Sequence, residues 1–178
     1  MIERVWVVGA GAIGSLYAAH LARVCDVSVL CRREEHARAL SQRGLRVSGR
    51  HDFTATLRAS SDPAALPPFD LAIVATKATE LDVAASRLAG HSPRGAVMTV
   101  QNGLGAEELV RRHGEWNLIS AVTFMSGTRH EDTHVEYILD TATWLGPYEG
   151  TPLALAEEAG ALLVRSGLEA EVLPDLRP

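Results

Sequence analysis

Short apolar runs alternate with segments of helical spacing along most of the chain. Residues 71–75 form a continuous apolar run, which is typical of a strand buried on both faces of a parallel sheet. Residues 2–8, 26–31, 96–100 and 118–122 are mostly apolar and also read as strands. The segments between them place apolar residues on one face of a helix, and they cover residues 13–24, 33–43, 78–89 and 106–113. This alternation predicts an α/β fold built on a doubly wound, mostly parallel sheet.

The pattern changes after Phe124. Residues 135–139 and 143–145 read as an antiparallel pair of strands around residues 140–142, which predicts an antiparallel addition to the sheet. The remaining predictions are a hairpin or edge strands, a last helix and a closing strand, over residues 45–59, 151–165 and 169–173. One core is expected, because 178 residues with 47% hydrophobic side chains suit one well-filled domain, which we predict over residues 1–173.

A glycine motif stands where the first strand should turn into a helix, and it reads Gly9-Ala10-Gly11-Ala12-Ile13-Gly14. The first glycine permits the tight turn, the second allows close approach of a pyrophosphate, and the third lets the helix pack on the strand. The alternative is that these glycines only shape a turn. The strand before them and the helix and strand after them favour a dinucleotide site in a Rossmann-like domain.

The end of the second predicted strand bears on the choice of cofactor. A carboxylate there would bond the ribose 2′-hydroxyl of NAD, whereas an arginine would bind the 2′-phosphate of NADP. This chain has Cys31-Arg32-Arg33 at that place. Solvated arginines at a helix start are the alternative, but cations are unfavourable there without an anionic partner. The sequence therefore favours NADP(H), with Arg32 at the phosphate.

Charge and cysteine content exclude several classes of function. The net charge of −5 argues against nucleic acid, which needs a concentrated cationic surface. No apolar stretch approaches the roughly 20 residues that span a bilayer, so we expect no membrane partner and a cytoplasmic protein. Cys25 and Cys31 flank a strand about 20 Å long at about 3.3 Å per residue, too far apart for a disulfide. They are expected to be free thiols.

The residues that follow the other predicted strands are polar, and ligands of such sheets bind beyond the carboxyl ends of the strands. They are Thr76-Lys77, Gln101-Asn102-Gly103 and Ser126-Gly127. Taken singly, Lys77 reads equally well as an exposed residue at a helix start, and Asn102 as a turn or cap residue.

The histidines do not suggest a site. His130 and His134 are four residues apart but fall in a turn-rich segment, so we expect solvated loop side chains and no metal. His36 is expected on a helix surface.

The sequence resembles the ketopantoate reductase family, whose members reduce 2-dehydropantoate to pantoate with NADPH on the route to pantothenate and coenzyme A. The resemblance rests on the glycine motif, on Val29-Leu30-Cys31-Arg32, on residues 70–78 with their Thr-Lys-Ala, and on Gln101-Asn102-Gly103-Leu104-Gly105. It implies that Arg32 holds the 2′-phosphate and that Lys77 lies on the ribose side. It also implies that Asn102 lies at the nicotinamide ribose near the substrate and that Ser126 lines the nicotinamide end. Glu80 departs from the family, where some members have a neutral Gln near the adenine.

A second departure is the absence of the family's helical second domain. In family members that domain supplies the general-acid lysine and a carboxylate that orients the substrate, whereas Lys77 is the only lysine in residues 1–178. No catalytic residue is therefore expected in this chain. Residues 174–178 resemble the start of the interdomain connection, which favours a shortened reductase that self-associates through the uncovered face.

Three other interpretations stay open at this point. The chain could be a cofactor domain that works with a separately encoded helical domain, or the cofactor domain of a related 2-oxo acid or opine dehydrogenase. The third is a stand-alone NADP(H)-binding module without turnover.

Overall fold

The computed structural model describes residues 1–101 and 105–176. Its main sheet runs in the order β12-β11-β8-β7-β6-β1-β2-β5, and these strands span Ala170–Val172, Thr143–Pro147, Asn117–Thr123, Ala96–Thr99, Leu71–Val74, Arg4–Val8, Asp26–Leu30 and Arg58–Ser60. All neighbouring pairs are parallel except β11 with β8. The predicted mostly parallel sheet with an antiparallel addition after residue 124 is thus confirmed.

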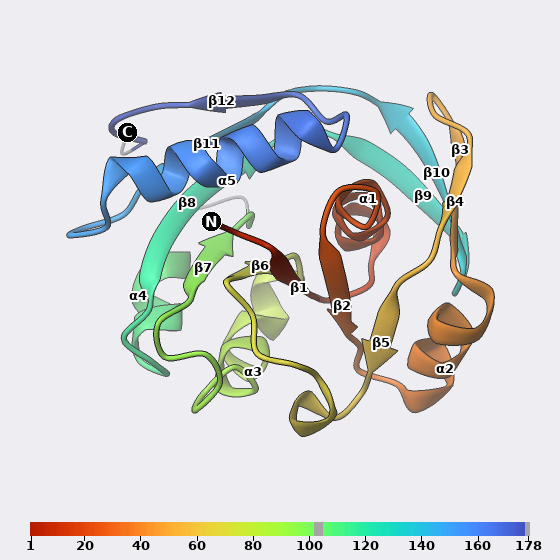
Figure 1. The fold of residues 1–178 in the computed structure, drawn as a ribbon, viewed down its shortest axis with the longest axis horizontal. Helices are drawn as coiled ribbons and strands as arrows, with labels where there is room; N and C mark the ends of the chain where they lie inside the picture. The colour runs from red at the N-terminus through yellow and green to blue at the C-terminus, as the bar shows by residue number, and fades with distance from the viewer. Residues whose placement is uncertain (102–104, 177–178) are drawn as a thin grey trace.

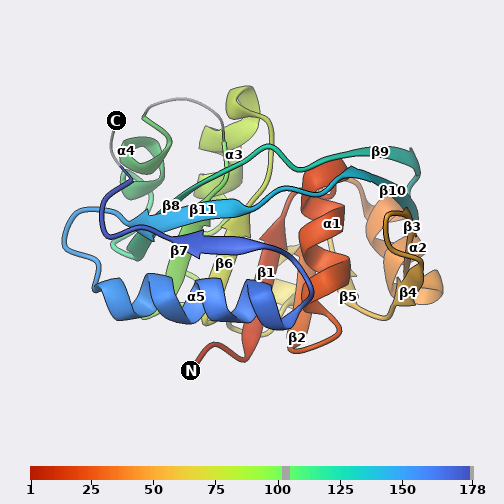
Figure 2. The same ribbon diagram turned by 90° about the horizontal axis from the view of Figure 1, so that it is seen from above.

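Helices cover both faces of this sheet (Figures 1 and 2), and they are α1 (Ala12–Leu21), α2 (Glu34–Arg43), α3 (Leu81–Ser86), α4 (Ala106–Arg111) and α5 (Leu153–Arg165). Short 3₁₀ turns, η1 and η2, span Pro63–Ala65 and Ala78–Glu80. Strand β1 shows why both faces are apolar: Val5 and Val7 join the core under α1 and α5, whereas Trp6 and Val8 join the core under α3 and α4. Side chains alternate along a strand, so an all-apolar run is needed to fill both cores.

A second, smaller sheet covers the side of α1 that faces away from the main sheet, and Figure 1 shows its strands to the right of that helix. Its order is β4-β3-β10-β9, and the strands span Phe53–Ala55, Leu45–Gly49, His134–Leu139 and Ser126–Glu131. Residues 14–21 of α1 are all buried as a result, because a helix between two sheets has no solvent face. The glycine-loop helix is therefore packed between the two sheets.

The predicted pairing of residues 135–139 with 143–145 is wrong. Strand β10 pairs with β9 and β3 in the small sheet, whereas β11 pairs with β8 and β12 in the main sheet. Alternation identifies a strand but says nothing about its partner. Residues 140–142 therefore cross from one sheet to the other instead of forming a hairpin turn.

His36 differs from expectation, and His130 and His134 lie on strands rather than in a loop, although the His130 side chain is exposed as expected. His36 is buried, and its Nε2 donates to the Asp132 carbonyl at 2.8 Å. His130 and His134 lie on β9 and β10 with their rings 5.1 Å apart, and they contact Glu136 and Ser48 respectively. The local sequence is rich in turn residues and predicted a loop, but packing on α1 stabilises a pair of strands there.

The thiols of Cys25 and Cys31 are free, as predicted. In the part of the chain that the structure describes, every helix is too short or too polar to cross a membrane.

Candidate functional site

The glycine motif forms the turn between β1 and α1, and each glycine answers a different demand of the backbone. Gly9 has φ +98°, and its N–H donates to the Leu30 carbonyl at 3.1 Å. A Cβ at Gly14 would lie 1.9 Å from the Gly9 carbonyl oxygen, so the helix can approach the turn only without a side chain. A Cβ at Gly11 would meet nothing within 4 Å. The motif therefore leaves one open place, at Gly11.

The N-terminus of α1 opens onto this space. The Ser15 N–H donates to the Gly11 carbonyl at 2.9 Å, and helix geometry leaves the N–H groups of the first turn without intrahelical acceptors. No side chain caps this end, and its first turn holds no acidic residue. Ala10, Ala12 and Ile13 are half-buried around it. Unpaired N–H groups and the helix dipole together attract an anion such as a phosphate.

Arg32 lies just past the end of β2, and its side chain is 80% exposed. Its Nη1 donates to Glu80 Oε1 at 2.7 Å. Cys31 stands at the strand end itself, where burial raises the pKa of its thiol to about 12. A neutral buried thiol is a poor nucleophile, so Cys31 offers no reactive group here. Arg32 places an exposed cation beside it.

Thr76, Lys77 and Gln101 follow β6 and β7 on the same edge. The Gln101 Nε2 donates to the carbonyls of Val74 and Thr76 at 2.8 and 3.1 Å. Gln101 Oε1 and Thr76 Oγ1 are buried and have no hydrogen-bond partner among the described residues. The Lys77 side chain is exposed and makes no ion pair within the described chain. This edge thus holds one exposed cation and two buried oxygens without a hydrogen-bond partner among the described residues.

The structure says less about the two remaining predicted site residues, Asn102 and Ser126. Asn102 lies outside the described residues, so its predicted role near the substrate stays a prediction. Ser126 begins β9 and pairs with Leu139 of β10. Its neighbour Gly127 packs on α1, since a Cβ there would lie 3.1 Å from Leu16 Cδ1. Ser126 therefore begins a strand of the small sheet that packs on α1.

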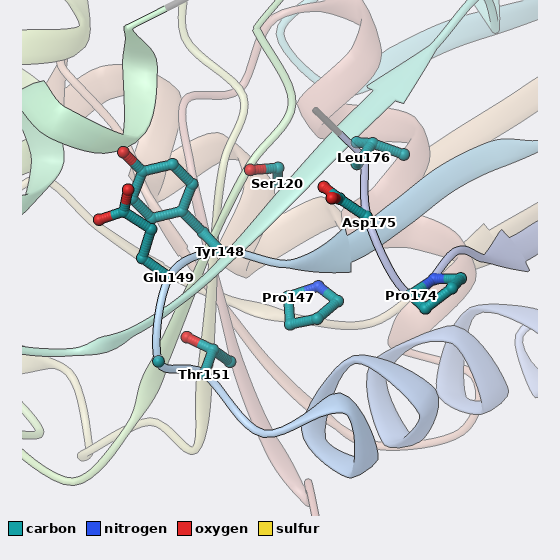
Figure 3. A pocket seen from close by; sticks show the side chains of 9 residues that line it. Ser120, Pro147, Tyr148, Glu149, Thr151, Pro174, Asp175 and Leu176 are labelled. Carbon is teal, nitrogen blue, oxygen red and sulfur yellow. The ribbon is translucent and has the colours of Figure 1, made fainter. Parts of the chain in front are cut away.

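A cavity of about 200 Å³ lies elsewhere, where β11 leads into α5 and the last described residues pass. Figure 3 shows Tyr148 and Asp175 among its lining side chains, with Ser120 and Thr151. None of the predicted site residues lines this cavity. The candidate site is therefore the open edge around the glycine loop rather than this cavity.

Most residues of this edge could be predicted from the sequence, but the unpartnered oxygens and the Arg32–Glu80 ion pair could not. Thr76 and Gln101 were visible as strand-end residues, yet nothing in the sequence distinguishes their unpartnered oxygens. Glu80 was visible as a departure, but its ion pair with Arg32 joins residues 48 positions apart. Among the described residues, no group of three or more His, Cys, Asp or Glu is arranged to hold a metal.

Comparison with known proteins agrees with this geometry. The model of the family described as "Ketopantoate reductase PanE/ApbA" matches residues 5–150. A 2-dehydropantoate 2-reductase of Pyrococcus horikoshii is 31% identical over 174 residues, which are 97% of this chain and 57% of that protein.

Solved structures show the same likeness. The crystal structure of 2-dehydropantoate 2-reductase from Geobacter metallireducens has a TM-score of 0.85 at 29% identity, over 97% of this chain and 58% of that one. D-mandelate dehydrogenase with NADH and anilino(oxo)acetate has a TM-score of 0.88 at 20% identity, over 97% and 57% of the two chains, which is a likeness of fold.

The chain spans little more than half the length of the curated relatives it matches. The family match nevertheless covers most of its residues, from β1 to the turn before α5. The chain belongs to the ketopantoate reductase family.

Proposed function

We propose that this chain is the NADP(H)-binding half of a 2-dehydropantoate 2-reductase, which reduces a 2-oxo acid, 2-dehydropantoate, to pantoate. The observation that carries the cofactor is Arg32, a strongly exposed guanidinium just past the end of β2, on the strand next to β1 and its glycine loop. The substrate is inferred from the names of the relatives.

The residues present fit a dinucleotide phosphate. The open place at Gly11 and the unpaired N–H groups of α1 suit the pyrophosphate. A planar guanidinium matches a phosphate in a bidentate way, which suits Arg32 to the 2′-phosphate, with Lys77 on the ribose side. Asn102 and Ser126 are proposed for the nicotinamide end.

The chemistry divides between this chain and a part that the relatives possess beyond it. Bound NADPH supplies a hydride to the keto carbon, and the developing alkoxide then needs a proton donor. Lys77, the only lysine in residues 1–178, is assigned to the cofactor. We infer that the general acid and most substrate contacts belong to a helical domain of the kind that the family resemblance implies.

The free thiols of Cys25 and Cys31 favour a location in the cytoplasm, where thiols stay reduced.

The test is NADPH oxidation at 340 nm with 2-dehydropantoate, using the 178-residue chain and a version extended through the downstream reading frame. General acid catalysis typically contributes about 10²–10⁴-fold, and loss of substrate orientation adds to this. We expect the isolated chain to bind NADPH and to turn over at least about a hundredfold more slowly than the extended one. Turnover within about tenfold would place the catalytic groups inside residues 1–178 and refute the division.

A further inference from the structure

We propose that Glu80 competes with the 2′-phosphate of NADP(H) for Arg32, so that this site discriminates less against NAD(H) than Arg32 alone would make it. The inference rests on the proposed function, because it concerns the same phosphate. It assigns Glu80 the role of a specificity-determining residue.

The ion pair spans the mouth of the candidate site. Arg32 follows β2 and Glu80 ends η2 after β6, and these two strands are the neighbours of β1 in the sheet. The contact at 2.7 Å between Nη1 and Oε1 therefore bridges the end of β1, where the glycine loop begins. A 2′-phosphate bound by Arg32 has to enter beside this carboxylate.

Nothing else in the described chain competes for either group. The ion pair with Glu80 is the one that Arg32 makes within residues 1–101 and 105–176, and the Glu80 carboxylate has no second cation there. Both side chains are largely exposed, at 80% and 47%, so neither is required by the core. Both side chains can therefore rearrange when a ligand binds, and substitutions at either position should leave the fold intact.

The two cofactors meet this pair differently. The phosphate of NADP(H) either displaces Glu80 from the guanidinium or shares Arg32 with it, and in both cases a carboxylate stands close to a phosphate dianion. The 2′-hydroxyl of NAD(H) instead can donate a hydrogen bond to a carboxylate, as it does in NAD sites to the carboxylate at the end of the second strand. Glu80 thus opposes one cofactor and accommodates the other.

The experiment is calorimetric titration of NADPH and NADH into the wild-type chain, Glu80→Gln, Arg32→Ala and the double variant. Glu157→Gln is the matched control, because it removes the same charge from an exposed position on α5. Thermal unfolding of each variant checks the fold. We expect Glu80→Gln to tighten NADPH by about three- to fivefold, in keeping with an exposed and salt-screened pair, and to leave NADH unchanged or weaker. Glu157→Gln should change neither.

The double variant separates the possible causes. Competition for Arg32 predicts that Glu80→Gln tightens NADPH less than about twofold once Arg32 is alanine, because the contested group is gone. An equal gain in both backgrounds would show direct repulsion of the phosphate and overturn the competition.

The remaining results separate this inference from the proposed function. An NADPH-to-NADH ratio that falls in Arg32→Ala but does not change in Glu80→Gln would overturn the inference and leave the proposed function standing. A ratio that Arg32→Ala does not change would refute both.

Discussion

Replacement of Gly11 by alanine should separate cofactor binding from folding. The backbone at Gly11 has φ −75° and ψ −171°, which alanine adopts freely, and a Cβ there meets no atom within 4 Å. The loss of a favoured N-cap residue and the gain from a less flexible unfolded chain are each about 0.5–1 kcal/mol and opposite in sign. The free energy of unfolding should therefore change by less than about 1 kcal/mol.

Binding should respond much more strongly. The added methyl group occupies the place where a pyrophosphate would approach the N-terminus of α1. Loss of one charge-assisted hydrogen bond costs about 1.5–3 kcal/mol, which is about ten- to a hundredfold in affinity. Urea unfolding and NADPH titration on the same preparation measure the two effects.

Gly14→Ala is the matched control, because its Cβ would lie 1.9 Å from the Gly9 carbonyl oxygen. Overpacking against backbone costs about 1–3 kcal/mol or more, so this variant should lose stability first. The reasoning is refuted if Gly11→Ala binds NADPH as tightly as the wild-type chain. A loss of stability in Gly11→Ala as large as that in Gly14→Ala would refute it equally.

Two further predictions concern stability and assembly. Burial lowers the pKa of His20 from 6.5 to about 4, so the unfolded chain binds a proton between these pH values that the folded chain does not. The free energy of unfolding should therefore fall by up to roughly 3 kcal/mol as pH drops through that window. In His20→Gln, urea unfolding should show a free energy of unfolding that depends less steeply on pH. An equally steep dependence in the two proteins would contradict this. Phe124 is 62% exposed and Leu139 is 47% exposed, so we expect dimers or larger species by light scattering. A strictly monomeric chain at high concentration would count against an uncovered docking face.

The order of strands and helices along the chain could be predicted from the sequence, because the burial of each residue determines whether it is apolar or polar. The run at β6, Leu71–Val74, is apolar throughout since helices cover both faces of the sheet. The glycine motif was equally predictable, because Gly9 and Gly14 meet backbone demands that no other residue satisfies. These are local constraints, and local constraints are visible in a single sequence.

Contacts between distant segments could not be predicted in this way. Strand β10 alternates like any half-buried strand, and its pairing with β3 rather than β11 depends on how both sheets enclose α1. His36 looks like a surface residue until Asp132, 96 positions away, receives its hydrogen bond. The Arg32–Glu80 pair is of the same kind, so the sequence named both residues without indicating that they touch.

The most direct test of the central claim is the affinity of the 178-residue chain for NADPH and for NADH, measured by calorimetry with wild type and Arg32→Ala. The account predicts that the wild-type chain binds NADPH more tightly. It also predicts that Arg32→Ala weakens NADPH by about tenfold or more and NADH by less than about threefold. Tighter binding of NADH by the wild-type chain, or an equal loss of both cofactors in the variant, would contradict an NADP(H) site at Arg32.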